Sequence, residues 1–243
     1  MELQNLEAQI AKAKENYRNL ELELFSGLYR KILDFEQPLE ELIATIAELD
    51  VVVSCVELAA QRKYVRLKVD ESSELHIVAG RHPFVEQSGS FVPNDTHFTS
   101  EERICLLTGP NMAGKSTYLR QNALIVILVQ MGSFVPADYA HIGVVDKVFT
   151  RIGASDNIAK GKSTFMVEML ETANIVNNAT DRSFVILDEV GRGTSTLDGI
   201  SIAQVVLEYS HDSINCRTIF ATHYNELCEL EKSLNGLSVT LSK

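Results

Sequence analysis

A glycine-rich segment that ends in a lysine and a serine is the first place where this chain could do chemistry. Residues 109–116 read Gly-Pro-Asn-Met-Ala-Gly-Lys-Ser, which fits the pattern G-x-x-x-x-G-K-S. An apolar run at 104–107 precedes it and an apolar helix pattern follows, which is the strand–loop–helix context that the pattern requires. The glycines let backbone N–H groups point at phosphates, Lys115 neutralises phosphate charge, and the Ser116 hydroxyl is suited to bind Mg²⁺. The segment therefore predicts a nucleoside triphosphate site.

Two acidic residues end a second apolar run further along the chain. Residues 184–187 read Phe-Val-Ile-Leu and are followed by Asp188 and Glu189. In enzymes with this kind of phosphate loop, an acid at a strand end holds the Mg²⁺ shell, which predicts that role for Asp188. Glu189 is then placed to orient or deprotonate the attacking water. By itself the pair would fit solvated carboxylates, but behind a phosphate loop it indicates nucleotide hydrolysis.

Three further polar segments are less specific. Residues 191–199 form a glycine-rich loop that can approach phosphate or a neighbouring subunit closely, or can serve only as a flexible connector. His223 follows an apolar strand pattern, where it is suited to sense a γ-phosphate, although a lone histidine is usually structural. Residues 156–169 open a helix, which indicates either a second anion site or an ordinary cap at Ser163 or Thr164.

The elements that must position these residues begin with a helical region. Apolar residues from 3 to 24 alternate spacings of three and four, which is typical of a coiled-coil-like helix. The apolar positions then drift up to residue 35, and Pro38 marks the predicted end of the helix. A second helix is predicted at about 39–60. We expect the two to form a helical hairpin with a mechanical role and no chemistry.

From about residue 75 the pattern becomes one of strands alternating with helices. This alternation predicts an α/β fold, in which a parallel sheet is covered on both faces. The predicted helices span 116–131, 164–178 and 200–211. The predicted strands span 76–78, 104–108, 144–149, 183–187 and 214–221. After them the chain is expected to fade into a polar tail.

Composition and charge bound the location and the partners. The net charge of −11 and the absence of a basic stripe argue against direct binding of nucleic acid by these residues. The four cysteines form no C-x-x-C pair, which favours a reducing, cytosolic compartment. The longest apolar run, 123–129, is too short to span a bilayer, and no signal region begins the chain. We therefore expect a soluble, cytoplasmic protein with no membrane partner.

Four ordered strings together resemble the MutS family of DNA mismatch-repair ATPases. They are TGPNMAGKST at 108–117, GKSTFMVEM at 161–169, LDEVGRGTST at 187–196 and ATHY at 221–224. The resemblance covers essentially the whole chain. It implies a P-loop NTPase domain of the ABC-ATPase type over 73–243, without the family's C-terminal dimerisation helices, and a helical lever segment over 1–72. The implied activity is hydrolysis of ATP to ADP and phosphate, coupled to mismatch recognition and sliding-clamp formation on DNA.

The resemblance also implies roles for single residues. Asp188 and Ser116 would hold Mg²⁺. The catalytic residues would be Glu189, which activates water, Lys115, which binds phosphate, and His223, the switch histidine. ATP or ADP would be held by a larger set: Phe91 and Val92 on the adenine, then Gly109, Pro110, Asn111 near the γ-phosphate, Met112, Ala113, Gly114, Lys115, Ser116 and Thr117.

The implied partners lie on other chains or domains. Ser163 would reach in trans to the nucleotide of a second subunit, and residues 194–198 would link the two sites of a homodimer. Mismatched double-stranded DNA would be contacted through domains that this chain lacks, and a MutL-type repair protein is the other implied partner. The chain departs from the family pattern at Ala113, where glycine is common, and at 160–162, where a Ser/Arg-flavoured turn is usual.

Two other interpretations stay open on the sequence. Another ABC-type DNA-repair or chromosome ATPase would share the loop and the acids, but would carry a Leu-Ser-Gly-Gly signature in place of the string at 161–166. A non-enzymatic interaction module is the second, because the helices that support dimerisation in the family are absent. ATPase activity measured as a function of protein concentration distinguishes this interaction module from an ATPase, because turnover per chain that rises with concentration indicates a composite dimer site.

Overall fold

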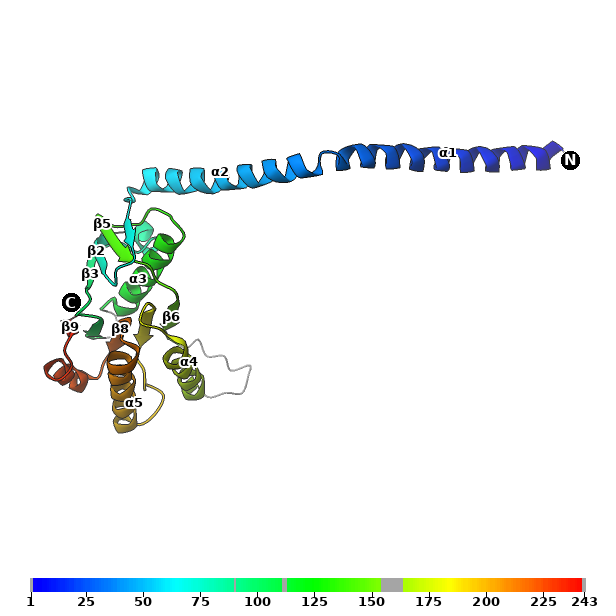
Figure 1. Cartoon of the computed structure of the whole chain (residues 1–243). Coiled ribbons are helices and arrows are strands. Elements are labelled where there is room, and N and C mark those ends of the chain that lie inside the picture. The colour runs from blue at the N-terminus through cyan, green and yellow to red at the C-terminus, as the bar shows by residue number, and fades with distance from the viewer. Residues whose placement is uncertain (1, 90, 111–112, 154–163, 242–243) are drawn as a thin grey trace. The chain divides into compact units, whose positions relative to one another are not determined.

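The computed structural model describes residues 2–89, 91–110, 113–153 and 164–241 (Figure 1). These divide by their contacts into two compact units, Met1–Cys55 and Val56–Lys243, which are described in turn. The division is one of packing, and the predicted boundary between a lever segment and an ATPase domain at residue 72 stays a prediction. In the part of the chain that the structure describes, no helix combines the length and apolarity needed to cross a membrane.

Two long helices account for residues 2–62. Helix α1 spans Glu2–Leu33 and helix α2 spans Glu36–Arg62, with a two-residue turn between them. The predicted break at Pro38 therefore lies a few residues too late. Pro38 is in the first turn of α2, where a proline fits because the N–H that it lacks would have no helical acceptor.

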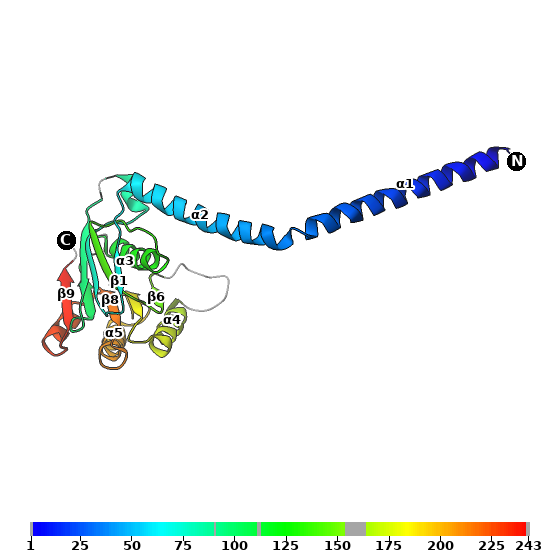
Figure 2. The same cartoon turned by 45° about the horizontal axis from the view of Figure 1, so that its top comes forward.

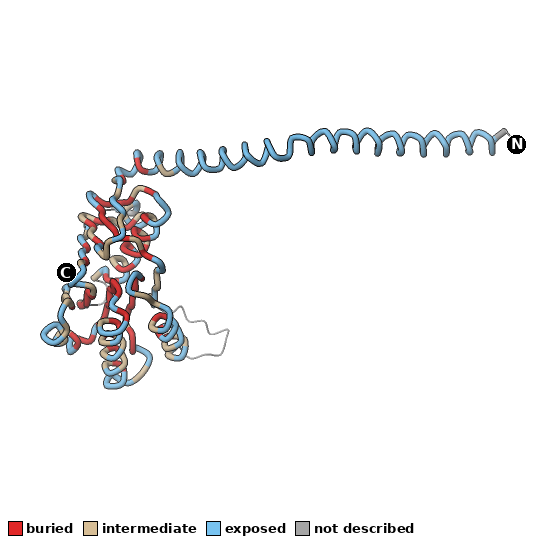
Figure 3. Tube along the Cα trace, in the orientation of Figure 1, coloured by how far each residue is buried: buried red, intermediate tan, exposed pale blue. Residues whose placement is uncertain are grey.

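The expected hairpin of these helices is not formed. The trace of both helices is almost entirely exposed in Figure 3, and Leu6, Ile10, Leu42 and Ile46 each expose more than half of their surface. A hairpin would bury these apolar positions against each other. At the turn, Phe35 N donates to Ile32 O and Leu39 N to Phe35 O, so helical bonding resumes at once without a loop that reverses the chain.

Five parallel strands of the second unit form one sheet, in the order β6-β7-β8-β4-β9. They span Val148–Arg151 (β6), Phe184–Asp188 (β7), Arg217–Thr222 (β8), Ile104–Thr108 (β4) and Leu237–Leu241 (β9). Because β8 lies between β4 and β7, the carboxyl ends of these three strands meet at one edge. The predicted parallel sheet is confirmed, and β4 has the predicted bounds.

Helices cover both faces of this sheet (Figures 1 and 2). Helix α3 (Lys115–Gln130) packs on one face, and α4 (Thr164–Asn178) and α5 (Thr196–Tyr209) pack on the other. In β4, Cys105 and Leu107 belong to the core cluster that includes α3, whereas Ile104 and Leu106 belong to the cluster that includes α5. A strand that is buried on both faces has to be apolar at every position. This explains why the sequences of β4 and β7 are continuous apolar runs and do not alternate with polar residues.

A second sheet of four strands, in the order β1-β5-β2-β3, was largely missed by the pattern. Its strands span Lys68–Asp70 (β1), Tyr139–Gly143 (β5), Leu75–Gly80 (β2) and Asn94–Phe98 (β3), and the short helix η1 spans Val85–Ser88. Its apolar residues share one core with α3 and the parallel sheet, and the rings of Phe98 and Phe184 have centroids 6.3 Å apart. Helix α3 is therefore packed against both the parallel sheet and the second sheet.

The strand predicted at 144–149 is wrong in its bounds, because it bridges two strands. Residues 144–147 connect β5 to β6. The Asp146 carboxylate accepts hydrogen bonds from Thr180 Oγ1 at 2.7 Å and from Ser183 Oγ at 2.8 Å, which fixes this connection in a turn. The carbonyl of Val144 accepts from Arg217 Nη2 at 3.1 Å and is therefore turned out of the strand ladder.

The expected polar tail is wrong as well. After β8 the chain forms the short helix η4 (Asn225–Lys232) and then β9, which pairs with β4 along its whole length. Gly236 has φ +85°, and a Cβ there would lie 1.9 Å from the carbonyl oxygen of Glu101, so this turn requires glycine. Between α5 and β8, a single π-helical turn, η3, spans Ser210–Ile214.

Candidate active site

The glycine-rich loop connects β4 to α3, as its pattern predicts. Gly114, which precedes the first helical residue, has φ +83°, a left-handed conformation that glycine adopts without strain. Lys115 begins the 16-residue helix and is only 6% exposed, and its Nζ donates to the carbonyl of Gly109 at 2.5 Å. The ammonium group thus lies near the N-terminus of α3 and is bonded to the start of the loop. At a helix N-terminus, backbone N–H groups and the helix dipole favour an anion.

Ser116 and Asp188 bring the loop and the acidic strand end together. The Ser116 hydroxyl donates to Asp188 Oδ2 at 2.9 Å, although the two residues are 72 positions apart in the sequence. Burial raises the pKa of the Asp188 carboxyl above its ordinary value, the hydrogen bond from Ser116 opposes this shift, and the neighbouring Glu189 adds to it. The positive charges of Lys115 and Arg151 also oppose the rise in the pKa of Asp188, but they do not outweigh burial.

This pair of residues fits a magnesium ion. A hydroxyl and a carboxylate are oxygen ligands, and Mg²⁺ usually binds proteins through one or two carboxylates and completes its shell with phosphate and water. Within the described ranges, no group of three or more His, Cys, Asp or Glu side chains could hold a metal ion. The residues present therefore fit a metal ion that is bound together with a nucleotide, whose phosphates supply further ligands. The described residues do not form a site in which protein side chains alone surround the metal.

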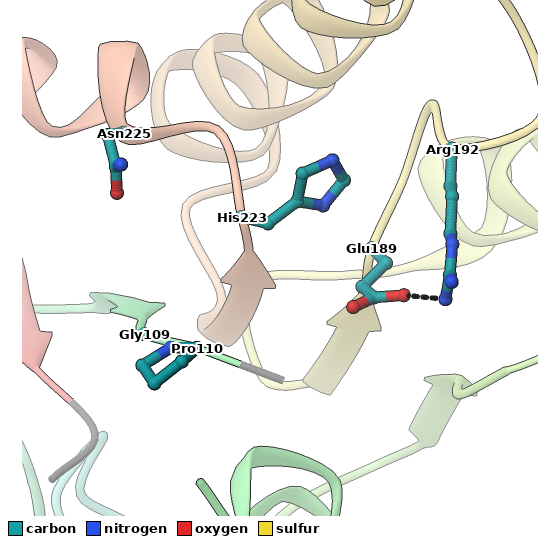
Figure 4. Close-up of a pocket in the computed structure, with 6 residues that line it drawn as sticks. All are labelled: Gly109, Pro110, Glu189, Arg192, His223 and Asn225. Atoms are coloured by element: carbon teal, nitrogen blue, oxygen red, sulfur yellow. Dashed lines mark hydrogen bonds and ion pairs between the residues drawn. The ribbon is translucent and has the colours of Figure 1, made fainter. Parts of the chain in front are cut away.

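Glu189 follows Asp188 in a constrained backbone conformation. Its φ is +53°, and its N–H donates to the carbonyl of Ala221 at the end of β8, at 2.9 Å. Its carboxylate forms an ion pair with the guanidinium of Arg192 (Figure 4). A cavity of about 520 Å³ lies beside this pair, and it is lined by Gly109, Pro110, Glu189, Arg192, His223 and Asn225. The acid thus lines the same cavity as Gly109 and Pro110 of the loop.

His223 lies just beyond β8, the strand between the loop strand and the acidic strand. Figure 4 shows it between Asn225 and Glu189 at the same edge. The residue is exposed, and its ring centroid is 4.2 Å from that of Tyr224. Strand order therefore brings together the predicted loop, acid and histidine, which are distant in the sequence.

A second cavity, of about 770 Å³, opens on the other side of the loop. It is lined by Phe91 and Val92 together with Ala113, Gly114 and Thr117 of the loop and helix start, and by Asn94, Asp95, Leu107, Tyr118, Thr240 and Leu241. The predicted adenine residues are thus adjacent to the predicted phosphate residues. The mixture of apolar and polar groups suits a flat heteroaromatic base.

Several residues around the two cavities were not predicted. Thr240 and Leu241 come from β9, whose pattern resembled a polar tail, and Tyr118 follows the motif by a single residue. Arg192 lies inside a quoted string, and its spacing of three residues from Glu189 was the only sequence signal for the ion pair. The places of Thr240 and Leu241 depend on the pairing of β9 with the distant strand β4, which local pattern does not report.

The loop after the acids starts a helix. Ser195 is the N-cap of α5: its Oγ accepts from Asp198 N at 3.3 Å and donates to Asp198 Oδ2 at 2.7 Å. A capped helix start is an ordered element, so the alternative of a flexible connector is not supported for residues 195–198. The predicted link to a second site through 194–198 stays a prediction. Asn111, Met112, Ser163 and the turn at 160–162 lie outside the described residues.

Comparison with known proteins identifies the family of the chain. Residues 105–242 match the family model described as MutS domain V. The chain is 55% identical over 236 residues to the DNA mismatch repair protein MutS of Ehrlichia ruminantium (strain Welgevonden), with 97% of this chain and 29% of that protein covered. It is 54% identical over 243 residues to MutS of Thermodesulfovibrio yellowstonii, with 96% and 28% covered. The chain thus spans less than a third of the length of these curated relatives. The chain belongs to the MutS family, because residues 105–242 match the family model and 97% of the chain aligns with a curated MutS protein at 55% identity.

Proposed function

We propose that this chain binds ATP with Mg²⁺ at the loop 109–117 and hydrolyses it to ADP and phosphate. The observation that carries the proposal is the hydrogen bond of 2.9 Å between Ser116 Oγ and Asp188 Oδ2. It joins the hydroxyl at the start of α3 to the acid at the end of β7, which is the arrangement that phosphate-loop enzymes use to hold a nucleotide-bound metal. When bound, Mg²⁺ would supply positive charge to the phosphate oxygens.

The residues around the loop would divide the work of hydrolysis. Lys115 and the backbone N–H groups of Gly114 and its neighbours bind and orient phosphate oxygens. Glu189 takes a proton from the attacking water, since its carboxylate lines the cavity next to the loop. That carboxylate is paired with Arg192, so Glu189 acts only after the ion pair has opened or shifted. His223 lines the same cavity and is placed to contact the terminal phosphate.

The nucleotide base would occupy the cavity of about 770 Å³. Phe91 and Val92 offer apolar contact, and Val92 is 77% exposed, which leaves it available to a ligand. Asn94 and Thr240 add polar groups that can recognise the edge of a base. Gly114 and Thr117 of the phosphate loop also line this cavity, so a base bound there would lie next to the phosphate site.

We further infer that two copies combine to complete the sites, with Ser163 acting in trans. Arg192 lines the cavity beside Glu189, and the chain that follows it leads into α5, where Leu197 is 79% exposed. That exposed apolar side chain is available for burial by a second subunit. The partners of the whole protein would be mismatched double-stranded DNA and a MutL-type protein. With a net charge of −11, these residues would leave DNA contact to other parts of the protein.

An ATP binding and turnover experiment tests the proposal. We expect the chain to bind ATP only weakly without Mg²⁺, and turnover per chain to rise with protein concentration. Glu189→Gln should keep binding and lose steady hydrolysis by about 10²–10⁴-fold, the usual contribution of a general base. Glu229→Gln is the matched control, because Glu229 is an exposed acid of η4 that pairs with Lys232 away from the cavity. Equal turnover of Glu189→Gln and the wild type would refute the assignment.

The same experiment decides between hydrolysis and a purely binding role. A chain that binds ATP but shows no turnover at any concentration would support the interaction module, for which the ion pair of Glu189 with Arg192 provides a reason. Turnover that is independent of concentration would contradict the composite site and leave the single-chain site in place.

A further inference from the structure

The turn that follows Glu189 is held at one residue, Gly191, by side chains from two distant elements. Gly191 has φ +89°, and a Cβ at this position would lie 2.4 Å from the carbonyl oxygen of Gly199 in α5. A Cβ at Gly199 would in turn lie 2.3 Å from the hydroxyl oxygen of Tyr224. Neither glycine leaves room for a side chain. The turn, the start of α5 and Tyr224 are thus packed as one unit.

The N–H side of this turn is held from α4. Glu168 is a buried acid, 4% exposed, and its Oε1 accepts from Gly191 N at 2.5 Å. Its Oε2 lies 3.4 Å from Arg151 Nη2, and Arg151 is itself only 5% exposed. Arg151 pairs in register with Leu187, one residue before Asp188. The buried charge of Glu168 is therefore balanced by a residue of the sheet, and its second oxygen is directed at the turn.

The carbonyl side of the turn is held from the end of β8. Tyr224 Oη donates to Gly191 O at 3.1 Å, and Tyr224 is 5% exposed. The residue directly follows His223, and the two rings have centroids 4.2 Å apart. The hydroxyl of Tyr224 thus bonds the segment that carries His223 to the turn at Gly191. The backbone N–H of Glu189 is bonded to Ala221 of the same strand, which strengthens this connection.

We propose that Glu168 and Tyr224 are positioning residues that clamp Gly191 from opposite sides and so set the orientation of Glu189 towards the loop. The proposal rests on the proposed hydrolysis of ATP. The clamp connects three elements, α4, β8 and the start of α5, to a backbone segment two residues from the acid that activates water. A movement of α4 would be transmitted to Glu189 through the carboxylate of Glu168.

Two conservative variants separate positioning from general stability. Glu168→Gln keeps the shape of the side chain, but its one oxygen can take only one of the two positions that Oε1 and Oε2 hold. The NH2 group of the amide then faces either the Gly191 N–H or Arg151, which are both donors. Tyr224→Phe keeps the packed ring and removes only the hydroxyl. Glu171→Gln is the control: Glu171 is on α4 and lies 3.1 Å from Arg151 Nε, but its side chain is half exposed and it does not contact Gly191.

The test measures ATP affinity, kcat and hydrogen exchange of the turn in the full chain, at the concentration where turnover of the wild type is highest. We expect Glu168→Gln and Tyr224→Phe to keep the wild-type Kd for ATP and to lower kcat by about tenfold or more, since small misplacement of a reacting group has effects of this size. The peptide that contains Gly191 should exchange faster in both variants. Glu171→Gln should match the wild type in all three measurements.

The outcomes distinguish this proposal from the proposed function. If the wild type hydrolyses ATP and Glu189→Gln does not, while both clamp variants keep wild-type kcat and exchange, the clamp is overturned and the function stands. If Kd and kcat change together with a general rise in exchange across the sheet, the residues are merely structural and the clamp is also overturned. If the wild type shows no turnover, the proposed function fails, and exchange at Gly191 alone then decides whether the clamp exists.

Discussion

Replacement of Lys115 by methionine tests the phosphate loop most directly. The Lys115 amine is buried, and its hydrogen-bond partner among the described residues is the carbonyl of Gly109. An ammonium group has three N–H donors, which leaves two for phosphate oxygens. Each hydrogen bond to a charged group contributes about 1.5–3 kcal/mol, so losing two costs about 3–6 kcal/mol. At 1.4 kcal/mol per factor of ten, the Kd for ATP should rise by about 10²–10⁴-fold.

The chain offers a matched control for this substitution in Lys147→Met. Lys147 Nζ also donates to one backbone carbonyl, that of Asn178 at 3.1 Å, but it is exposed and lies outside the loop. Each variant loses one hydrogen bond to a carbonyl, so each should lose about 1 kcal/mol of unfolding free energy. Only Lys115→Met should lose ATP binding. Isothermal titration with ATP and Mg²⁺, together with urea unfolding, measures both quantities.

Two results would refute the reasoning about Lys115. Wild-type affinity in Lys115→Met would mean that the ammonium group contributes nothing to phosphate binding. An equal loss of affinity in Lys115→Met and Lys147→Met would mean that the effect comes from stability and not from the loop. In either case the role assigned to the Lys115 ammonium group would be wrong.

The remaining predictions concern stability. Arg217→Met should lower the free energy of unfolding by about 3–5 kcal/mol in urea titrations, because the fully buried guanidinium donates to three carbonyls, at 2.9–3.1 Å, that would lose their partner. Burial lowers the pKa of His211, but hydrogen bonds to Asn235 O and Asp212 outweigh this and raise it above 6.5. His211→Gln should therefore cost most stability below about pH 6.5 and progressively less as the pH rises through the raised pKa, which a series of melting temperatures would show. Gly236→Ala should lower the melting temperature by several degrees, because a Cβ there meets Glu101 O at 1.9 Å, and an unchanged melting temperature would contradict that geometry.

The parts of the fold that could be predicted from the sequence are those with strong local signals. The strand at 104–108 and the helix at 164–178 are continuous apolar or periodic runs with clear ends, and both have the predicted bounds. The strands β1 and β3 were missed because they are short and rich in polar residues. Their pairing is decided by neighbours far away in the sequence, such as β5 for β1.

The same division holds at the candidate site. Lys115, Ser116, Asp188 and Glu189 are marked by motifs, and the structure places them around one edge of the sheet. Glu168 lies inside the string at 161–169 and Tyr224 inside the string at 221–224, but neither string reports a contact with Gly191. Those contacts are set by how α4 and the end of β8 pack, so they become visible only when the elements are assembled.

The pairing of β9 with β4 has a consequence for how the protein is made. Strand β4 lies between β8 and β9, which come more than 100 residues later in the chain. Until those segments have been synthesised, Ile-Cys-Leu-Leu at 104–107 has neither neighbour. An apolar strand with two open edges invites pairing with other chains, and contacts of long sequence separation form slowly. Strand β4, which leads into the phosphate loop, is therefore exposed to aggregation during synthesis on the ribosome. A substitution that slows the pairing of β9 with β4 should lower the yield of folded protein more than it alters the site in molecules that have folded.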